Sequence, residues 1–343
     1  RNELSLDHLD TVANFIVKNA DGVQLGYDQG QTHADPFTGG NRYVPGQSAG
    51  GSGGETASID PFTSGSRYVP ADRVSGFVPP SAVVVNRKGN GAAIVAKLAE
   101  FNEQLAQDAD TASVAVDQKD MQLIGELAGL GGPAAVPVSE AAYGALLRVV
   151  RGWPAAKRFP ALDMLRLAVA DSPIPARHHA NGGSDLVACV GEASGLFGLT
   201  AGAGHEVNAM MGARALANAC ATTEGANAVW AARKVVLAGL EGAWSAVANK
   251  NLVTALSTVY LNLAILAAKQ GDDDDGLEIL SEAGRFLGST DNPDAQLRLV
   301  NVFGVLATRF QLCKDSARVL GDEVIVVLGI QGKTDAVKQA ARD

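Results

Sequence analysis

Apolar side chains recur at helical spacing along the chain from residue 91 to its end. In residues 251–270, small and polar residues occupy one side, and a broad apolar face is formed by Leu256, Val259, Tyr260, Leu263 and Leu266. No alternation of apolar and polar residues typical of strands competes with this pattern. The periodicity predicts helices near residues 91–106, 117–130, 138–152, 159–171, 183–197, 205–221, 224–246, 251–270, 276–288, 293–312, 315–329 and 332–341.

Short segments rich in glycine and proline separate the predicted helices. They include Gly131-Gly132-Pro133, Asn181-Gly182-Gly183 and Asn292-Pro293, together with Pro173 and Pro175. A long array of helices joined by short loops is typical of an α-solenoid. The pattern therefore favours an all-α fold.

Four of the predicted helices resemble one another. When they are aligned, Arg166, Asn218, Asn262 and Gly304 occupy one equivalent position, and these residues are 52, 44 and 42 residues apart. The last two steps fall within the roughly 40–47 residues of armadillo and HEAT repeats. We therefore expect an armadillo-like helical superhelix.

The first 76 residues have a different character. Apolar spacing predicts a short helix within residues 1–19, whereas residues 20–76 are rich in Gly, Ser, Pro, Asp and Gln and predict a flexible linker. A motif that begins Asp35-Pro36-Phe37-Thr38 returns at Asp60-Pro61-Phe62-Thr63, and both copies end in Arg-Tyr-Val-Pro. This motif is either a docking sequence used twice or a local duplication without a role. A short extended piece at residues 81–86 follows the linker.

The aligned helices carry polar residues that repeat along one surface. In a solenoid, equivalent helices line a single concave face. Asparagine both donates and accepts hydrogen bonds, so it suits the backbone of an extended peptide, and arginine suits carboxylates. The pattern thus predicts a groove for an acidic peptide, lined by Arg166, Arg214, Asn218, Asn262, Arg298 and Asn301. The plainer interpretation makes Asp163–Arg166 and Asp294–Arg298 ordinary surface pairs and leaves the asparagines in solvent.

Charge and cysteine content narrow the class of protein. The net charge of −9 argues against nucleic acid as a partner. The three cysteines, Cys189, Cys220 and Cys313, match no zinc or disulfide spacing, so we expect an intracellular protein. We found no apolar run long enough to cross a bilayer, and we expect no membrane partner. The chain begins at Arg1, so we expect a fragment of a longer protein.

Motifs for catalysis are absent or poor. The glycine-rich residues 46–54 lack the lysine of a phosphate loop, and Ser194 lacks the spacing of a nucleophile elbow. His178 and His179 are adjacent, so they make a poor metal pair, and we expect them in a solvated loop. We therefore predict a protein that is not an enzyme, with no catalytic residue, metal or cofactor.

Several segments resemble the phospholipase-activating protein (PLAA) family. The segment from Asp35 to Pro45 is similar to the linker between that family's two C-terminal domains, and residues 9–19 look like the closing helix of its ubiquitin-binding PFU domain. Residues 77–343 resemble its PUL domain, most strongly at residues 159–166, 213–218 and 249–252. The resemblance covers nearly the whole chain.

The resemblance implies a function. The family's PUL domain is an armadillo-like superhelix whose groove binds the C-terminal tail of the valosin-containing AAA ATPase, with arginines that would be Arg166 and Arg298 here. The family acts in ubiquitin homeostasis and ubiquitin-dependent degradation, so we expect a cytoplasmic and nuclear adaptor. Ubiquitin itself would bind through the part of the PFU domain that this chain lacks. The alternative is a self-assembling helical scaffold that does not bind the tail.

Overall fold

The computed structural model describes residues 78–133, 136–200, 205–247, 249–318 and 334–342. They belong to the second of the two units into which the chain divides, residues 72–343. The helix predicted within residues 1–19 and the linker at 20–76, with its duplicated motif, lie outside the described residues.

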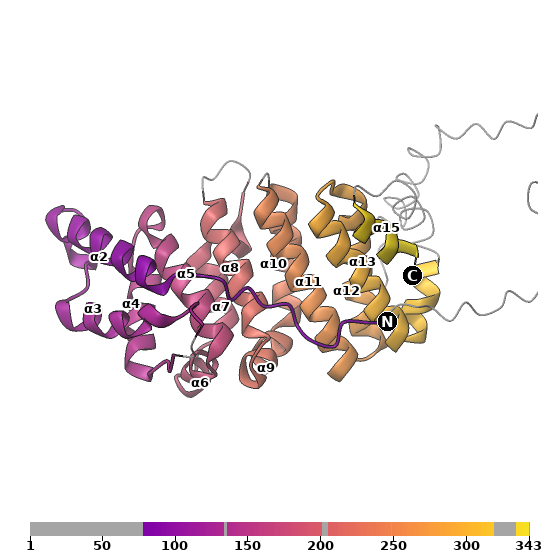
Figure 1. The fold of residues 1–343 in the computed structure, drawn as a ribbon, viewed down its shortest axis with the longest axis horizontal. Helices are drawn as coiled ribbons and strands as arrows, with labels where there is room; N and C mark the ends of the chain where they lie inside the picture. The colour runs from indigo at the N-terminus through magenta and orange to yellow at the C-terminus, as the bar shows by residue number, and fades with distance from the viewer. Residues whose placement is uncertain (1–77, 134–135, 201–204, 248, 319–333, 343) are drawn as a thin grey trace, which may run out of the picture. The chain divides into compact units, whose positions relative to one another are not determined.

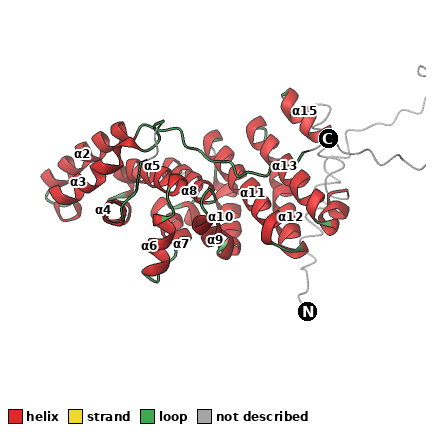
Figure 2. Ribbon diagram, turned by 60° about the horizontal axis from the view of Figure 1, so that its bottom comes forward, coloured by secondary structure: helices red, strands yellow, loops and turns green. Residues whose placement is uncertain are grey.

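Helices follow one another along the described part of the chain, and no strand occurs among these residues (Figures 1 and 2). They are α2 (Gly91–Gln107), α3 (Gln118–Gly125), α4 (Glu140–Gly152), α5 (Ala155–Asp171), α6 (Ile174–Asn181), α7 (Leu186–Ser194), α8 (Glu206–Ala219), α9 (Thr223–Ala231), α10 (Arg233–Ala246), α11 (Lys250–Gln270), α12 (Asp273–Ser289), α13 (Pro293–Arg309) and α15 (Asp335–Arg342). Short 3-10 turns lie at Ala112–Val114, Glu126–Gly129 and Leu196–Gly198. Residues 311–318 are also helical.

Local sequence explains where the central helices begin. The Asn249 side chain accepts the N–H groups of Asn251 and Leu252 at the start of α11. Asn292 does the same for Asp294 and Ala295 at the start of α13, where proline occupies the first helical position. Both asparagines satisfy N–H groups that the first turn of a helix leaves unpaired.

The aligned helices form one continuous row. Helix α5 packs on α8, α8 on α11, and α11 on α13; α2 packs on α5 at one end of this row and α15 on α13 at the other (Figure 1). Small side chains permit the close approach: every residue of α8 is buried except Glu206, Val207 and Arg214. One core of mostly leucine, alanine and valine runs through the array. The prediction of an armadillo-like helical superhelix is confirmed.

The expectation that no apolar run is long enough to cross a bilayer is wrong for helix α11. Its 21 residues are long and apolar enough to cross a bilayer by length and composition, although we found no such run in the sequence. Of the most apolar window of this helix, 72% is buried inside the fold. Because its neighbours α8 and α13 cover it, α11 is the central core helix of the array.

An extended segment, residues 78–90, crosses the row of aligned helices before α2 begins (Figure 1). We call it the strap. It passes α11, α8 and α5 in turn, and its last residue, Asn90, caps α2 by accepting the N–H of Ala93. Gly89 permits a close approach, since a Cβ atom there would lie 2.9 Å from a methyl carbon of Leu167.

The structure differs from the predicted helices at α6. The sequence pattern predicts helix breaks at Pro173 and Pro175 and a solvated loop at His178 and His179. Instead, Pro173 occupies the position just before α6 and Pro175 lies in its first turn, where the missing N–H of proline costs no hydrogen bond. The two histidines lie in this helix, and His179 is buried.

The helix predicted at 224–246 is two helices. Ala232 adopts φ −95° and ψ 13°, which ends α9 and starts α10 without any glycine or proline. The two pieces pack on different neighbours: α9 on α6, α7 and α8, and α10 chiefly on the turn at 196–198. The predicted helix at 293–312 likewise ends at Arg309, and most of the one predicted at 315–329 lies outside the described residues.

Candidate functional site

Asn262 and Asn218 each hold one residue of the strap by both of its backbone groups. Asn262 accepts the Val84 N–H at 2.7 Å and donates to the Val84 carbonyl at 2.9 Å. Asn218 holds Asn86 in the same way, at 2.6 Å and 3.0 Å. Each Nδ2 group also donates to a backbone carbonyl of the preceding aligned helix, at 2.9 Å and 2.7 Å. Both asparagine side chains are fully buried; their bonds to the neighbouring helices are buried, and those to the strap are partly buried.

Arg166 continues this pattern on α5. Its guanidinium donates to the carbonyls of Asn86 at 2.7 Å and Lys88 at 3.0 Å, and its Nε donates to Asp163 at 2.6 Å. The pair with Asp163 expected from the spacing is therefore present, but it is not a surface pair, because Arg166 is only 4% exposed. We call Arg166, Asn218 and Asn262 the ladder, since they bind strap residues 88, 86 and 84 in order.

The ladder does not extend onto α13. The aligned position there is Gly304, which has no side chain to offer. Asn301 donates instead to the carbonyl of Leu297 in its own helix, at 2.7 Å. The structure therefore does not bring Asn301 together with the other predicted residues.

A cavity of about 260 Å³ lies beside the strap. Its walls come from strap residues 84–88, from α8, from the first turns of α11 and from α13. Four cationic residues line it: Arg87, Lys88, Arg214 and Arg298. No aspartate or glutamate lines the cavity among the described residues, although the whole chain carries a net charge of −9.

Among the described residues, no carboxylate forms an ion pair with Arg214 or Arg298. Arg298 donates to the backbone carbonyl of Asp294 at 2.6 Å, while its buried Nε has no hydrogen-bond partner. No hydrogen bond or ion pair joins Arg214 to another described residue. Burial lowers the pKa of both guanidinium groups, and for Arg214 the nearby charge of Arg166 lowers it further. Both side chains stay charged near neutral pH, so an anion entering the cavity would meet two under-solvated cations.

The predicted site residues thus have three different positions. The ladder residues already bind the chain's own strap, Arg214 and Arg298 line the cavity, and Asn301 lies apart. Contact of a partner with any of them stays a prediction. Sequence reasoning missed Arg87 and Lys88. The signal that could have found them is a pair of basic residues directly after the extended segment at 81–86. Arg87 also forms an ion pair with Asp171 at 2.7 Å.

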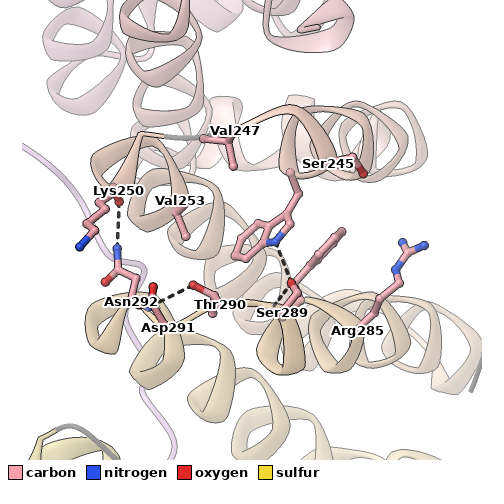
Figure 3. A pocket seen from close by; sticks show the side chains of 11 residues that line it. Ser245, Val247, Lys250, Val253, Arg285, Ser289, Thr290, Asp291 and Asn292 are labelled. Carbon is pink, nitrogen blue, oxygen red and sulfur yellow. Dashed lines mark hydrogen bonds between the residues drawn. The ribbon is translucent and has the colours of Figure 1, made fainter. Parts of the chain in front are cut away.

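A larger cavity of about 470 Å³ lies between the α10–α11 and α12–α13 connections (Figure 3). Trp244 stacks on Phe286 with ring centroids 4.5 Å apart and donates from Nε1 to Ser289 at 3.1 Å. Its charges are mixed, because Arg285 pairs with Glu241 and both Lys250 and Asp291 line the wall. The charges that line this cavity therefore favour an acidic ligand less than those of the cavity beside the strap.

A polar chain links the buried Tyr143 and His179 to the exposed Ser184. The Tyr143 hydroxyl lies 3.1 Å from His179 Nε2, and His179 Nδ1 lies 2.9 Å from Ser184 Oγ. Burial lowers the pKa of His179 to about 4 and raises that of the nearby Cys189 thiol. Ser184 closes the end of α6 through its N–H to the His179 carbonyl at 2.9 Å, so we interpret this chain as structural. No group of three or more possible metal ligands occurs in the described part of the chain.

Known proteins match most of the chain. A family model described as the PUL domain matches residues 78–343. Phospholipase A-2-activating protein of Xenopus laevis is 28% identical over 345 residues, covering 94% of this chain and 41% of that protein. This chain therefore spans less than half the length of that relative.

A solved structure agrees in fold. The structure described as "Crystal structure of PUL and PFU(mutate) domain" superposes with a TM-score of 0.53 at 16% identity, covering 77% of this chain and 78% of the other. Together with the sequence matches, it confirms the resemblance to the PLAA family. The chain belongs to the PUL domain family, a family of protein-interaction domains.

Proposed function

We propose that this chain is a non-catalytic adaptor that binds an acidic peptide in the cavity beside the strap. The peptide is the C-terminal tail of the valosin-containing AAA ATPase. The choice of this ATPase rests on the resemblance to the PLAA family, and the choice of cavity rests on the residues that line it.

The observation that carries the proposal is a cavity in an acidic protein whose described lining residues include four cations and no carboxylate. Buried charge is costly unless it is paired, and the buried Nε of Arg298 has no partner within the described residues. A carboxylate that reached Arg214 or Arg298 would form charge-assisted hydrogen bonds to half-buried guanidinium groups. Each such bond contributes about 1.5–3 kcal/mol.

Arg166 has a different role in this proposal. Its guanidinium already bonds to Asp163 and to two strap carbonyls, so few of its N–H groups remain for a ligand. It positions the strap, and the strap in turn supplies Arg87 and Lys88 to the cavity. A change at Arg166 would alter the site indirectly.

The test is a titration of the labelled tail peptide into residues 72–343, with Arg214→Gln and Arg298→Gln in parallel. Each change removes one cation but keeps a polar side chain, and we expect affinity to fall about tenfold or more. Lys234→Gln is the matched control, because it removes the same charge from an exposed position on α10. Lys250→Gln reports on the cavity of Figure 3.

The outcomes separate the possibilities. Weaker binding in both arginine variants, with the Lys234 and Lys250 variants unchanged, supports the cavity beside the strap. Loss of binding in the Lys250 variant alone would move the site to the larger cavity. Absence of binding to the unaltered chain, together with concentration-dependent oligomers in sedimentation, would support the self-assembling scaffold instead.

We further propose that the adaptor works in ubiquitin-dependent protein degradation, in the cytoplasm and nucleus. This part rests on the resemblance to the PLAA family alone. Ubiquitin would bind to the rest of a PFU domain in a longer protein. A pull-down of ubiquitin conjugates together with the ATPase that carries the tail, compared between a longer protein with the whole PFU domain and its Arg298→Gln variant, tests the link between the two activities.

A further inference from the structure

The ladder uses only one edge of the strap. In an extended chain, the N–H and C=O of one residue point to the same side, and those of the next residue point to the opposite side. The hydrogen bonds of the ladder go to Val84, Asn86 and Lys88, which are every second residue. The backbone groups between them must therefore point away from the ladder.

We call the alternate residues Val83, Val85 and Arg87 the outer edge of the strap. No hydrogen bond from another described residue reaches the backbone N–H or C=O groups of these three residues. A row of unpaired backbone groups on an extended segment is a template for pairing with another chain. Peptide-binding proteins use such edges to add a ligand as an extra strand.

The surroundings of the outer edge define the ligand's charge. Val85 and Arg87 both line the cavity that contains Arg214 and Arg298. A ligand paired with these two strap residues would run beside the two arginines that lack carboxylates. An extended peptide with acidic side chains matches both the backbone edge and the charges, whereas a basic or a helical ligand matches neither.

We infer that the acidic peptide binds as a second strand along the outer edge of the strap, with its backbone paired to Val85 and Arg87 and its carboxylates on Arg214 and Arg298. This inference rests on the proposed function and adds the mode of binding. The strap is then a part of the binding site, held by the ladder on one edge and open to the ligand on the other. Main-chain pairing supplies affinity, and the arginines select acidic sequences.

The experiment is a scan of the acidic peptide by backbone N-methylation, with the unaltered chain as receptor. Methylation removes one N–H donor at a time and changes no side-chain charge. We expect binding to weaken about tenfold where the methylated residue faces the strap, and to stay nearly unchanged at the residues between. An alternating pattern of two residues identifies strand pairing.

A pair of strap variants tests the same contact from the other side. Val85→Pro removes the backbone N–H on the outer edge. Val85→Ala loses a similar amount of side-chain packing but keeps this N–H. We expect the proline variant to bind about tenfold more weakly than the alanine variant. Protection of the Asn86 amide from hydrogen exchange shows that the strap stays in place in both.

The outcomes distinguish this inference from the proposed function. Binding with a uniform response to N-methylation, and equal affinity of the two Val85 variants, overturns strand pairing and leaves the adaptor function intact. Absence of any binding to the unaltered chain overturns the function and the pairing together. If the proline variant releases the strap, the N-methylation scan of the peptide alone tests strand pairing.

Discussion

Asn218→Ala is expected to release the strap from the centre of the groove. The side chain makes three hydrogen bonds: it accepts the N–H of Asn86 and donates to the carbonyls of Asn86 and Arg166. It is fully buried, so water cannot replace the lost partners without opening the groove. At about 0.5–1.5 kcal/mol for each of the three bonds, the free energy of unfolding should fall by roughly 1.5–4.5 kcal/mol.

Asn301→Ala is the matched control on α13. Asn301 makes one hydrogen bond to its own helix and is half-buried, so its loss should cost less than about 1 kcal/mol. Urea unfolding followed by far-UV circular dichroism measures both free energies. The ratio of the two losses in free energy of unfolding is more informative than either loss alone, because both variants replace the same residue type.

Hydrogen exchange measured by NMR locates the effect. In the unaltered chain, the amides of Val84 and Asn86 should be protected, and those of Val85 and Arg87 should exchange freely. Asn218→Ala should remove the protection of Asn86. Equal destabilisation in the two asparagine variants, or a protected Asn86 amide in Asn218→Ala, would refute the idea that the ladder holds the strap.

Two further predictions concern the core. Burial holds the pKa of His179 at about 4, below its value near 6.5 in the unfolded chain, so its contribution is present above pH 6.5 and is lost as pH falls toward 4. Stability should drop by about 2 kcal/mol more between pH 7 and pH 5 in the unaltered chain than in His179→Gln, whereas the exposed control His205→Gln should keep the full slope. A Cβ at Gly239 would lie 2.0 Å from the Phe197 ring, whereas Gly242 on the same helix faces open space. Gly239→Ala should cost about 1–3 kcal/mol and Gly242→Ala should stabilise by up to about 1 kcal/mol in urea unfolding; equal values would contradict the packing of Phe197.

Helical periodicity predicted most of the helices but not where every one ends. The sequence at Asn292-Pro293 marks a helix start through side-chain and proline chemistry that is local, and α13 begins there. The break at Ala232 has no such local signal. It arises because α9 and α10 pack against different neighbours. The pattern of apolar residues within one helix carries no information about those neighbours. At α6, the prolines do mark a helix boundary, but it is the start of a helix and not a loop.

The sequence predicted the ladder but not the segment that the ladder binds, because that segment is distant along the chain. Alignment of the repeats placed Arg166, Asn218 and Asn262 at equivalent positions, and they do form one ladder. The same alignment has Gly304 at the next step, which is where the ladder stops. No spacing rule showed that the extended peptide held by the ladder is the chain's own strap, because that contact joins residues 132 and 178 positions apart.

The amino-acid sequence by itself determined the all-α class, the repeated helices and the residues of the ladder, since helical periodicity and repeat spacing are properties of neighbouring positions. Only the tertiary structure decided which arginines remain without carboxylates. Arg166 and Arg298 look alike in sequence, each with an aspartate three or four residues before it. Folding buries Arg166 against Asp163 and the strap, whereas Arg298, in the wall of the cavity, bonds to no described group but a backbone carbonyl. Distance along the chain cannot predict this difference, because it depends on how residues 78–90 cross the helices.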